Sequence, residues 1–272
     1  MMASTQIKPS MCSIGWRDEP IRSAIEAVSQ AGYVGIEVWQ PHVERHLEVG
    51  GTLASLSALL EQHALTAPML SGYYDLAGRA EESLRDLERH AEQAEALQAP
   101  MLRMFTGGRS STEALPAAWD VVTETLQQAC DIADKRGLGI ALETHEGHLH
   151  DTTESTLCLL GSVARPNLFV NLDIYNLYAI GEDPVAALDQ LGPHVRMVHL
   201  KNAIRQNESR RLGIPLAEGD MPYAPFLHAL AESGYDGYAS IEWFGPLPAE
   251  AAISELRYLQ SVLGEHLARR TE

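Results

Sequence analysis

The sequence has few cysteines and no long hydrophobic run. Cys12, Cys130 and Cys158 are scattered and odd in number, and no CxxC pair occurs among them. A secreted disulfide framework is therefore excluded, and a reducing compartment is expected. The amino-terminal segment lacks the apolar stretch of a signal peptide, and no segment reaches the roughly 18 apolar residues of a membrane span. We expect a cytoplasmic protein without a membrane partner.

Basic residues are also scarce. The chain has 20 Lys and Arg against 37 Asp and Glu, which gives a formal net charge of −17. Nucleic acids and acidic membranes are bound through clusters of Lys and Arg, so neither is expected as a partner. The remaining composition is ordinary, with 45% hydrophobic and 21% charged residues over 272 positions. Such a chain can bury a sizeable core and suits a soluble enzyme for small molecules.

Eight short apolar runs alternate with eight longer amphipathic segments, and no linker or low-complexity tract interrupts them. This alternation predicts β-then-α units around a parallel sheet. Such units close most simply into a single (β/α)8 TIM barrel, which would make residues 1–272 one domain. An open doubly wound sheet is the alternative, but residues 12–16 (CSIGW) lack its glycine-rich phosphate turn. The predicted strands are 8–16, 33–39, 65–74, 99–106, 138–145, 168–175, 195–201 and 237–244, and the predicted helices are 19–31, 51–63, 79–97, 112–136, 152–164, 183–191, 222–233 and 249–268.

Ionisable residues stand at the ends of the last four predicted strands, where chemistry sits in a barrel of this kind. They are Glu143, Asp173, His199 and Glu242. Three carboxylates that converge on one mouth repel one another unless a cation or shared protons compensate them. Each carboxylate could instead be a helix N-cap or a salt-bridge partner, and the histidine could be a core residue. Four such residues at successive strand ends favour a metal site. Their donor set suits Mn²⁺ best, with Mg²⁺, Co²⁺ and Zn²⁺ as alternatives.

At these residues the chain resembles the sugar phosphate isomerase/epimerase family of xylose-isomerase-like TIM barrels. The resemblance extends from GYVGIEVW at 32–39 to SIEWFG at 240–245, with LETHEGHLHDT, VNLDIYNLYAIGEDP and VRMVHLKN as its strongest stretches. It implies that a divalent metal binds to Glu143, Asp173, His199 and Glu242. It also implies that Glu143 and Glu242 act as acid and base on either side of a keto or enediolate group.

Several positions depart from the ketose epimerases of this family. Asn176 stands where those enzymes carry a substrate-binding His, Met197 replaces the first His of a His-x-His motif, and Glu146 replaces an Asn. These departures weaken the expectation of direct ketose 3-epimerisation. His145 resembles the His of a subgroup, some of whose members act on 3-keto-sugars and eliminate a substituent. A hydrogen bond that supports a neighbouring residue is its other interpretation.

Two enzymatic activities are compatible with these residues. The first is a divalent-metal-dependent isomerase or epimerase of a sugar or keto-polyol, which works through metal-stabilised enolate or enediolate proton transfer. The second is a metal-dependent lyase or dehydratase on a 3-keto-sugar or related cyclic hydroxy-ketone, including deglycosidation by β-elimination. A homo-oligomer is expected, or a complex with a partner subunit if the protein is a lyase. A metal-bound sugar-binding subunit is the non-enzymatic alternative. The predicted catalytic residues are Glu143, Glu242 and His145.

Further polar and aromatic residues near strand ends are expected to contact the substrate. They are Glu37, Trp39, Arg103, Asn176 and Lys201. A salt bridge is the alternative role for Glu37 and for Lys201, and Arg103 could neutralise Glu37 rather than bind a substrate oxyanion.

Two loops carry additional charged or titratable candidates. His42 and His46 follow the second predicted strand and could close the mouth of the barrel. Arg205, Arg210 and Arg211 follow the seventh and are the best candidates for binding a phosphate. A solvated loop is the alternative interpretation in both cases.

Overall fold

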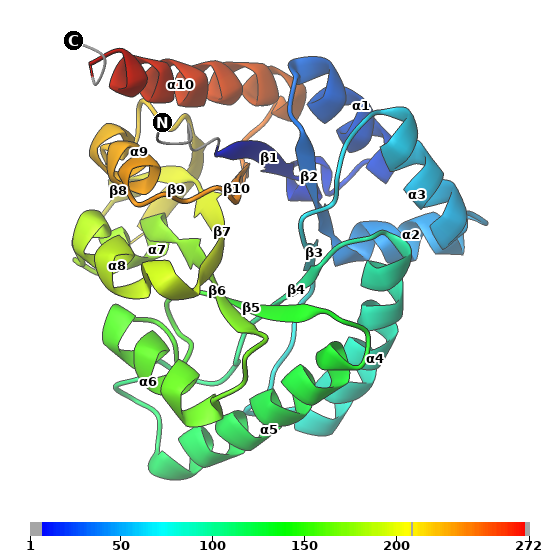
Figure 1. Cartoon of the computed structure of the whole chain (residues 1–272), viewed down its shortest axis with the longest axis vertical. Helices are drawn as coiled ribbons and strands as arrows, with labels where there is room; N and C mark the ends of the chain where they lie inside the picture. Colours follow the sequence, from blue (N-terminus) through cyan, green and yellow to red (C-terminus); the bar gives the residue numbers. More distant parts are fainter. Residues whose placement is uncertain (1–6, 208, 270–272) are drawn as a thin grey trace.

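Eight parallel strands form a closed barrel in a computed structural model of the chain, which describes residues 7–207 and 209–269. Around the barrel the order is β1-β10-β7-β6-β5-β4-β3-β2, so each barrel strand lies beside the next one in the chain. Figure 1 shows the helices as an outer ring around these strands. The fold is therefore a single (β/α)8 TIM barrel. Its strands are β1 (Lys8–Cys12), β2 (Gly35–Trp39), β3 (Leu70–Ser71), β4 (Met101–Met104), β5 (Gly139–Glu143), β6 (Leu168–Asp173), β7 (Val195–Leu200) and β10 (Tyr238–Ile241).

The helices connect successive strands on the outside of the barrel. They are α1 (Ile21–Ala31), α2 (Gln40–Glu48), α3 (Leu53–Gln62), α4 (Ala80–Ala96), α5 (Pro116–Asp134), α6 (Thr153–Val163), α7 (Ile174–Ala179), α8 (Pro184–Leu191), α9 (Tyr223–Glu232) and α10 (Pro248–Arg269), with 3-10 turns η1 (Ser13–Trp16) and η2 (Gly192–His194). Asp183 caps α8 by accepting hydrogen bonds from the backbone of Val185 and Ala186. The helix predicted at 183–191 is thus confirmed.

Side chains fill the barrel interior in layers. Alternate residues of a strand face the same side of a sheet. Ala141 therefore lies one layer below Glu143, and Met197 lies one layer below His199. These apolar residues belong to a separate buried cluster that comprises Met69, Met101, Ala141 and Met197. An apolar floor thus supports a polar layer at the carboxyl ends of the strands.

Two segments near the strand ends are helical rather than irregular or extended. Residues 40–48 form α2, and His42 on this helix is buried. Its Nδ1 lies 3.0 Å from Ser13 Oγ and its Nε2 lies 3.0 Å from the carbonyl oxygen of Trp16. The expectation that this histidine lies in a solvated loop is wrong, because both nitrogens have buried protein partners. The predicted strand 168–175 is shorter than expected, since α7 begins at Ile174.

The segment after β7 forms an antiparallel hairpin of β8 (Asn202–Gln206) and β9 (Ser209–Ile214). It was expected to be a loop. Asn202 ties the segment that follows the hairpin to β8, because its side-chain amide donates to the carbonyl oxygens of Leu216 and Met221 at 2.9 Å. The hairpin is therefore a fixed part of the barrel mouth.

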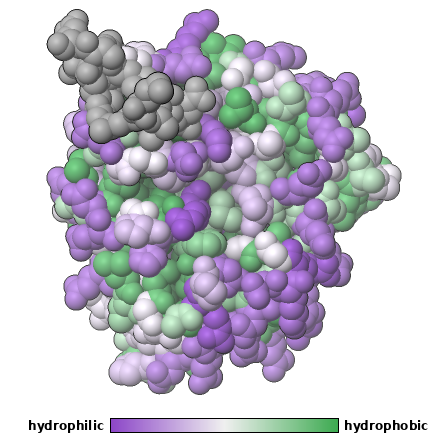
Figure 2. All heavy atoms as spheres, viewed as in Figure 1, coloured by the Kyte–Doolittle hydropathy of each residue, from purple (hydrophilic) through white to green (hydrophobic). Residues whose placement is uncertain are grey.

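Polar residues cover much of the outer surface. Figure 2 shows them spread over the visible face, with smaller groups of apolar residues between them. Among the helices in the described part of the chain, none is long and apolar enough to cross a membrane.

Candidate metal centre and substrate pocket

Four neighbouring strands bring the four predicted ligands together. Barrel closure places β5, β6, β7 and β10 side by side, and the register pairs Asp173 with His199. One ligand atom from each residue lies within 4.8 Å of the others, and all four residues are buried. The set is Glu143, Asp173, His199 and Glu242. The structure therefore contains an acidic and histidine cluster of the kind that holds a divalent metal ion.

The imidazole of His199 has one nitrogen bound to protein and one that faces the cluster. Its Nε2 lies 2.7 Å from a carboxylate oxygen of Glu37. Its Nδ1 is fully buried and has no hydrogen-bond partner among residues 7–207 and 209–269. This nitrogen lies 3.5 Å from Glu143 and 3.9 Å from both Asp173 and Glu242. A buried nitrogen without a partner is costly, and coordination of a cation would satisfy it.

The charges around the cluster also fit a divalent cation. The buried carboxylates are those of Glu37, Glu143, Asp173 and Glu242, and the buried permanent cations are Arg103 and Lys201. Four negative and two positive charges leave two negative charges, which a divalent cation would neutralise. Burial alone would lower the pKa of His199, but the Glu37 and Glu143 carboxylates raise that pKa well above its usual value. The site thus favours extra positive charge at the position of this imidazole.

Arg103 and Lys201 hold the ligand carboxylates in place. Arg103 Nη1 lies 2.9 Å from a Glu143 oxygen and 3.7 Å from a Glu242 oxygen. Lys201 Nζ lies 2.7 Å from Asp173 and 3.0 Å from Glu242. Burial would raise the pKa of Glu143, but Arg103 and then His199 bring it well below its usual value. The Glu143 carboxylate is therefore a weak base in this environment.

Asp173 is a helix N-cap and a salt-bridge partner as well as a member of the cluster. Its Oδ1 caps α7 by accepting a 3.2 Å hydrogen bond from the backbone N–H of Asn176, while its Oδ2 contacts Lys201. Burial raises the pKa of Asp173, and neighbouring carboxylates add to the effect of burial. Capping by one oxygen leaves the other available to a cation.

A cavity of about 470 Å³ lies beside the cluster. Lys201 connects the two, because it lines the cavity and contacts Asp173 and Glu242. The lining residues are His145, Glu146, Tyr175, Asn176, Lys201, Arg210, Leu212 and Phe244. Three residues predicted to act on or bind the substrate, His145, Asn176 and Lys201, are therefore brought together around one space.

His145 is held by its own loop and by aromatic neighbours. Its Nδ1 lies 2.7 Å from the backbone carbonyl oxygen of Glu146. Because a carbonyl oxygen only accepts, Nδ1 carries a hydrogen in this bond, so Nε2 is the ring nitrogen that could exchange a proton with a substrate. Phe105 packs edge-on against the ring with centroids 5.4 Å apart, and His148 does so at 5.3 Å. The ring is thus fixed in one tautomer at the cavity wall.

The other three predicted substrate contacts have protein partners. Glu37 is fully buried behind His199 and accepts a hydrogen bond from Ser71. Arg103 is 1% exposed, with its guanidinium over the rings of Tyr73 and Phe105. Trp39 Nε1 donates to the Tyr73 hydroxyl at 3.1 Å. None of the three lines the cavity, so the structure places Glu37 and Arg103 around the cluster rather than in the pocket.

Sequence reasoning missed several residues of the pocket. Phe244 directly follows Trp243, and Leu212 lies on the hairpin, for which the sequence predicts a loop. Tyr175 is a buried residue of α7, which was read as the end of a strand. The alternation along the hairpin was the available signal for Leu212. No local pattern distinguished Tyr175 or Phe244 from core aromatics.

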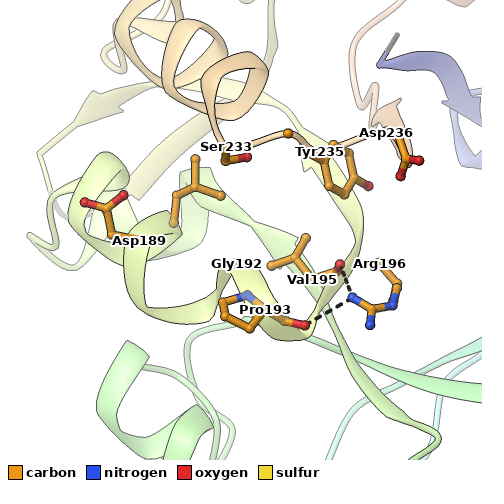
Figure 3. Close-up of a pocket in the computed structure, with 11 residues that line it drawn as sticks. Asp189, Gly192, Pro193, Val195, Arg196, Ser233, Tyr235 and Asp236 are labelled. Atoms are coloured by element: carbon orange, nitrogen blue, oxygen red, sulfur yellow. Dashed lines mark hydrogen bonds between the residues drawn. The ribbon is translucent and has the colours of Figure 1, made fainter. Parts of the chain in front are cut away.

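A second cavity, of about 510 Å³, lies at the opposite end of the barrel. Figure 3 shows it between the segments that lead into β7 and β10, with Arg196 donating to the backbone carbonyl oxygens of Pro193 and Val195. Because Val195 begins β7 whereas His199 stands near its end, this cavity is remote from the metal cluster. Active sites in barrels of this type lie at the carboxyl ends of the strands, so the cavity beside the cluster is the candidate substrate pocket.

Comparison with known proteins places this geometry in a family. The family described as xylose isomerase-like TIM barrel matches residues 25–262. The chain is 28% identical to 3-dehydroshikimate dehydratase from Bacillus anthracis over 93% of this chain and 96% of the relative. It is 26% identical to fructoselysine 3-epimerase from Shigella flexneri over 87% of this chain and 90% of the relative. For inosose dehydratase from Geobacillus thermodenitrificans the identity is 24%, over 89% and 91%.

A solved structure agrees with the sequence comparison. The crystal structure of a probable 3-DHS dehydratase from Bacillus anthracis superposes with a TM-score of 0.84 at 27% identity. The match covers 93% of this chain and 99% of that one. The similarity therefore extends over the whole barrel, and the relatives include both dehydratases and an epimerase.

Proposed function

This chain belongs to the xylose isomerase-like TIM barrel family, and within it we propose that the protein is a metal-dependent dehydratase of a cyclic hydroxy-ketone. The observation that carries the proposal is that two candidate bases form salt bridges, whereas the third lines the pocket. Glu143 is bound to Arg103 and Glu242 to Lys201, whereas His145 stands at the cavity wall with its Nδ1 donating to a backbone carbonyl oxygen. A single available base suits an elimination better than a reaction that needs two bases.

The metal would be held by the four buried strand-end residues. The donor set of three carboxylates and one imidazole supports Mn²⁺ as the preferred ion, with Mg²⁺, Co²⁺ or Zn²⁺ as substitutes. When bound, the ion supplies Lewis acidity that stabilises negative charge on a neighbouring carbonyl oxygen. Glu37 would position His199 by fixing its Nε2, so that Nδ1 is the ligand atom.

His145 would carry the proton transfers. Its Nε2 removes a proton from the carbon next to the ketone, and the C–H electrons form the enolate. The enolate then expels the β-hydroxyl group, to which the imidazolium returns the proton, so one molecule of water leaves. Asn176 and Lys201 would bind substrate oxygens, because both line the same cavity.

Epimerisation of a ketose is the second candidate. It is supported by the similarity to fructoselysine 3-epimerase and by the presence of Glu143 and Glu242 in one cluster. It requires a proton to be removed on one face of the substrate and returned on the other. The low pKa of Glu143 and the Asn at position 176 weigh against it.

Other properties are proposed on narrower grounds. We propose that residues 1–272 form one domain, since the barrel closes between β1 and β10. The scattered cysteines support a cytoplasmic protein, and the size of the cavity, about 470 Å³, supports a small-molecule substrate. A homo-oligomer remains a prediction.

Turnover by the Mn²⁺-loaded protein tests the function. We expect loss of water from 3-dehydroshikimate or an inosose, and no solvent deuterium in recovered ketoses. His145→Asn should lower kcat by roughly 10²–10⁴-fold. The control is His194→Asn at the opposite end of the barrel, which should leave kcat unchanged. A fully active His145→Asn, or deuterium-labelled epimers of a ketose without dehydration, would refute the assignment.

A further inference from the structure

We propose that Arg210 selects a substrate that carries a carboxylate, and that Glu146 occupies the position of this carboxylate in the free protein. The inference rests on the proposed dehydration and names its substrate class. It separates two kinds of cyclic hydroxy-ketone, since 3-dehydroshikimate is an anion and an inosose is uncharged. Neither Arg210 nor Glu146 belongs to the metal cluster.

Arg210 meets Glu146 across the wall of the pocket. Its Nη1 lies 3.0 Å from Glu146 Oε1 and its Nη2 lies 2.6 Å from Glu146 Oε2, so the guanidinium binds the carboxylate with two parallel contacts. Both residues line the cavity with His145. A bidentate pair of this kind is the geometry in which arginine recognises a free carboxylate.

The burial of each ion pair decides which cation can bind a ligand. The pair of Arg103 with Glu143 is 1% exposed on both sides, and removal of either partner would leave the other buried without its nearest opposite charge. Lys201 is held by Asp173 and Glu242, with its side chain 8% exposed.

The pair of Arg210 with Glu146 is different, because these side chains are 25% and 46% exposed. Exposed pairs contribute little to stability, so their separation by a competing carboxylate costs little. Among the described residues that line the cavity, Arg210 is thus the cation whose carboxylate partner is best replaced by one from the substrate.

Glu146 also connects this pair to the proposed base. Its backbone carbonyl accepts the hydrogen bond from His145 Nδ1, while its side chain holds Arg210 on β9. A substrate carboxylate that takes the place of the Glu146 side chain leaves this backbone bond intact. The anchor for the anion and the base would then lie on the same side of the pocket.

Kinetics on a charged and an uncharged substrate test the inference. Arg210→Ala should raise KM for 3-dehydroshikimate about tenfold or more and leave KM for an inosose unchanged. Arg210→Lys should recover only part of this loss. Glu146→Gln should lower KM for 3-dehydroshikimate severalfold, because it removes the internal competitor. Arg211→Ala is the matched control, since neighbouring residues of a strand face opposite sides.

A merely structural ion pair predicts a different pattern. Glu146→Gln would then raise KM just as Arg210→Ala does, or both substrates would be affected equally, and either result would overturn the inference.

Titration calorimetry with 3,4-dihydroxybenzoate and catechol gives a readout without turnover. Arg210→Ala should abolish the preference for the benzoate. If that preference responds but no hydroxy-ketone is dehydrated, the carboxylate site stands and the proposed function fails. If turnover occurs and Arg210→Ala changes neither KM nor the preference, the inference alone fails.

Discussion

The two nitrogens of His199 have different environments, and this difference defines the metal centre at the scale of single residues. Glu37 binds Nε2, while Nδ1 is buried among three carboxylates and has no hydrogen bond within the described part of the chain. Burial would raise the pKa of Glu37, but the imidazole lowers it below the usual value. A carboxylate behind a ligand histidine fixes the tautomer and the orientation of the ring.

Replacement of Glu37 tests this role. Glu37→Gln should weaken Mn²⁺ affinity about 10–100-fold while the fold is retained. The amide can still contact the His199 ring, but it lacks the negative charge that makes this ring a better metal ligand. Titration calorimetry with Mn²⁺ measures the change. Glu48→Gln, at an exposed position of α2, is the matched control. Equal affinities in the two variants would contradict the role assigned to Glu37.

At the scale of elements, the segment after the hairpin β8–β9 is joined to α10 by a buried hydrogen bond. Glu255 on α10 accepts a 3.0 Å hydrogen bond from the backbone N–H of Leu216, just beyond β9. Its side chain is buried, and burial raises its pKa to about 7. A protonated carboxyl group is therefore favoured where α10 meets the segment after β9.

The pH dependence of stability follows from this shift. The folded pKa of Glu255 lies above the unfolded value of 4.5, so its contribution is largest below pH 4.5 and is lost as pH rises toward about 7. The loss is at most about 3 kcal/mol. Glu255→Gln should flatten the decline in the free energy of unfolding over this range, as measured by urea denaturation at successive pH values. Parallel pH profiles of the wild type and the variant would rule out a role for Glu255.

At the scale of the whole molecule, barrel closure concentrates negative charge in one buried layer. The four carboxylates of this layer come from β2, β5, β6 and the end of β10, which are far apart in the chain. Among the described residues, Arg103 and Lys201 are the buried permanent cations that compensate them, and an apolar floor lies below. The excess charge opposes folding when no other cation is bound, because like charges repel strongly in a buried site.

Metal binding should consequently stabilise the entire barrel. At a free Mn²⁺ concentration of 100 times Kd, the free energy of unfolding should rise by about 2.7 kcal/mol, which raises Tm by about 5 °C for a chain of this length. Scanning calorimetry with and without a chelator measures the shift. Asp173→Asn should show a much smaller shift at the same Mn²⁺ concentration. An equal shift in this variant would place the stabilising ion elsewhere.

The sequence by itself determined the alternation of strands and helices and the residue types at the strand ends. Short apolar runs and the helical period of 3.6 are local patterns, so the eight barrel strands could be predicted, and the barrel they imply is confirmed. Glu143, Asp173, His199 and Glu242 could be singled out for the same reason, because each follows a buried run. Short elements such as α2 and α7 escaped prediction, since their few residues carry no clear period.

Only the tertiary structure decided how the polar residues pair. Glu37 and His199 are 162 positions apart in the sequence. No local pattern could therefore show that they bind each other. The same holds for Arg103 with Glu143 and for Arg210 with Glu146. The strength and function of an ion pair depend on its burial, which is set by the packing of the whole barrel. The sequence thus indicates the types of charged residue at the strand ends. The fold determines which of them are held in buried ion pairs and which line the pocket.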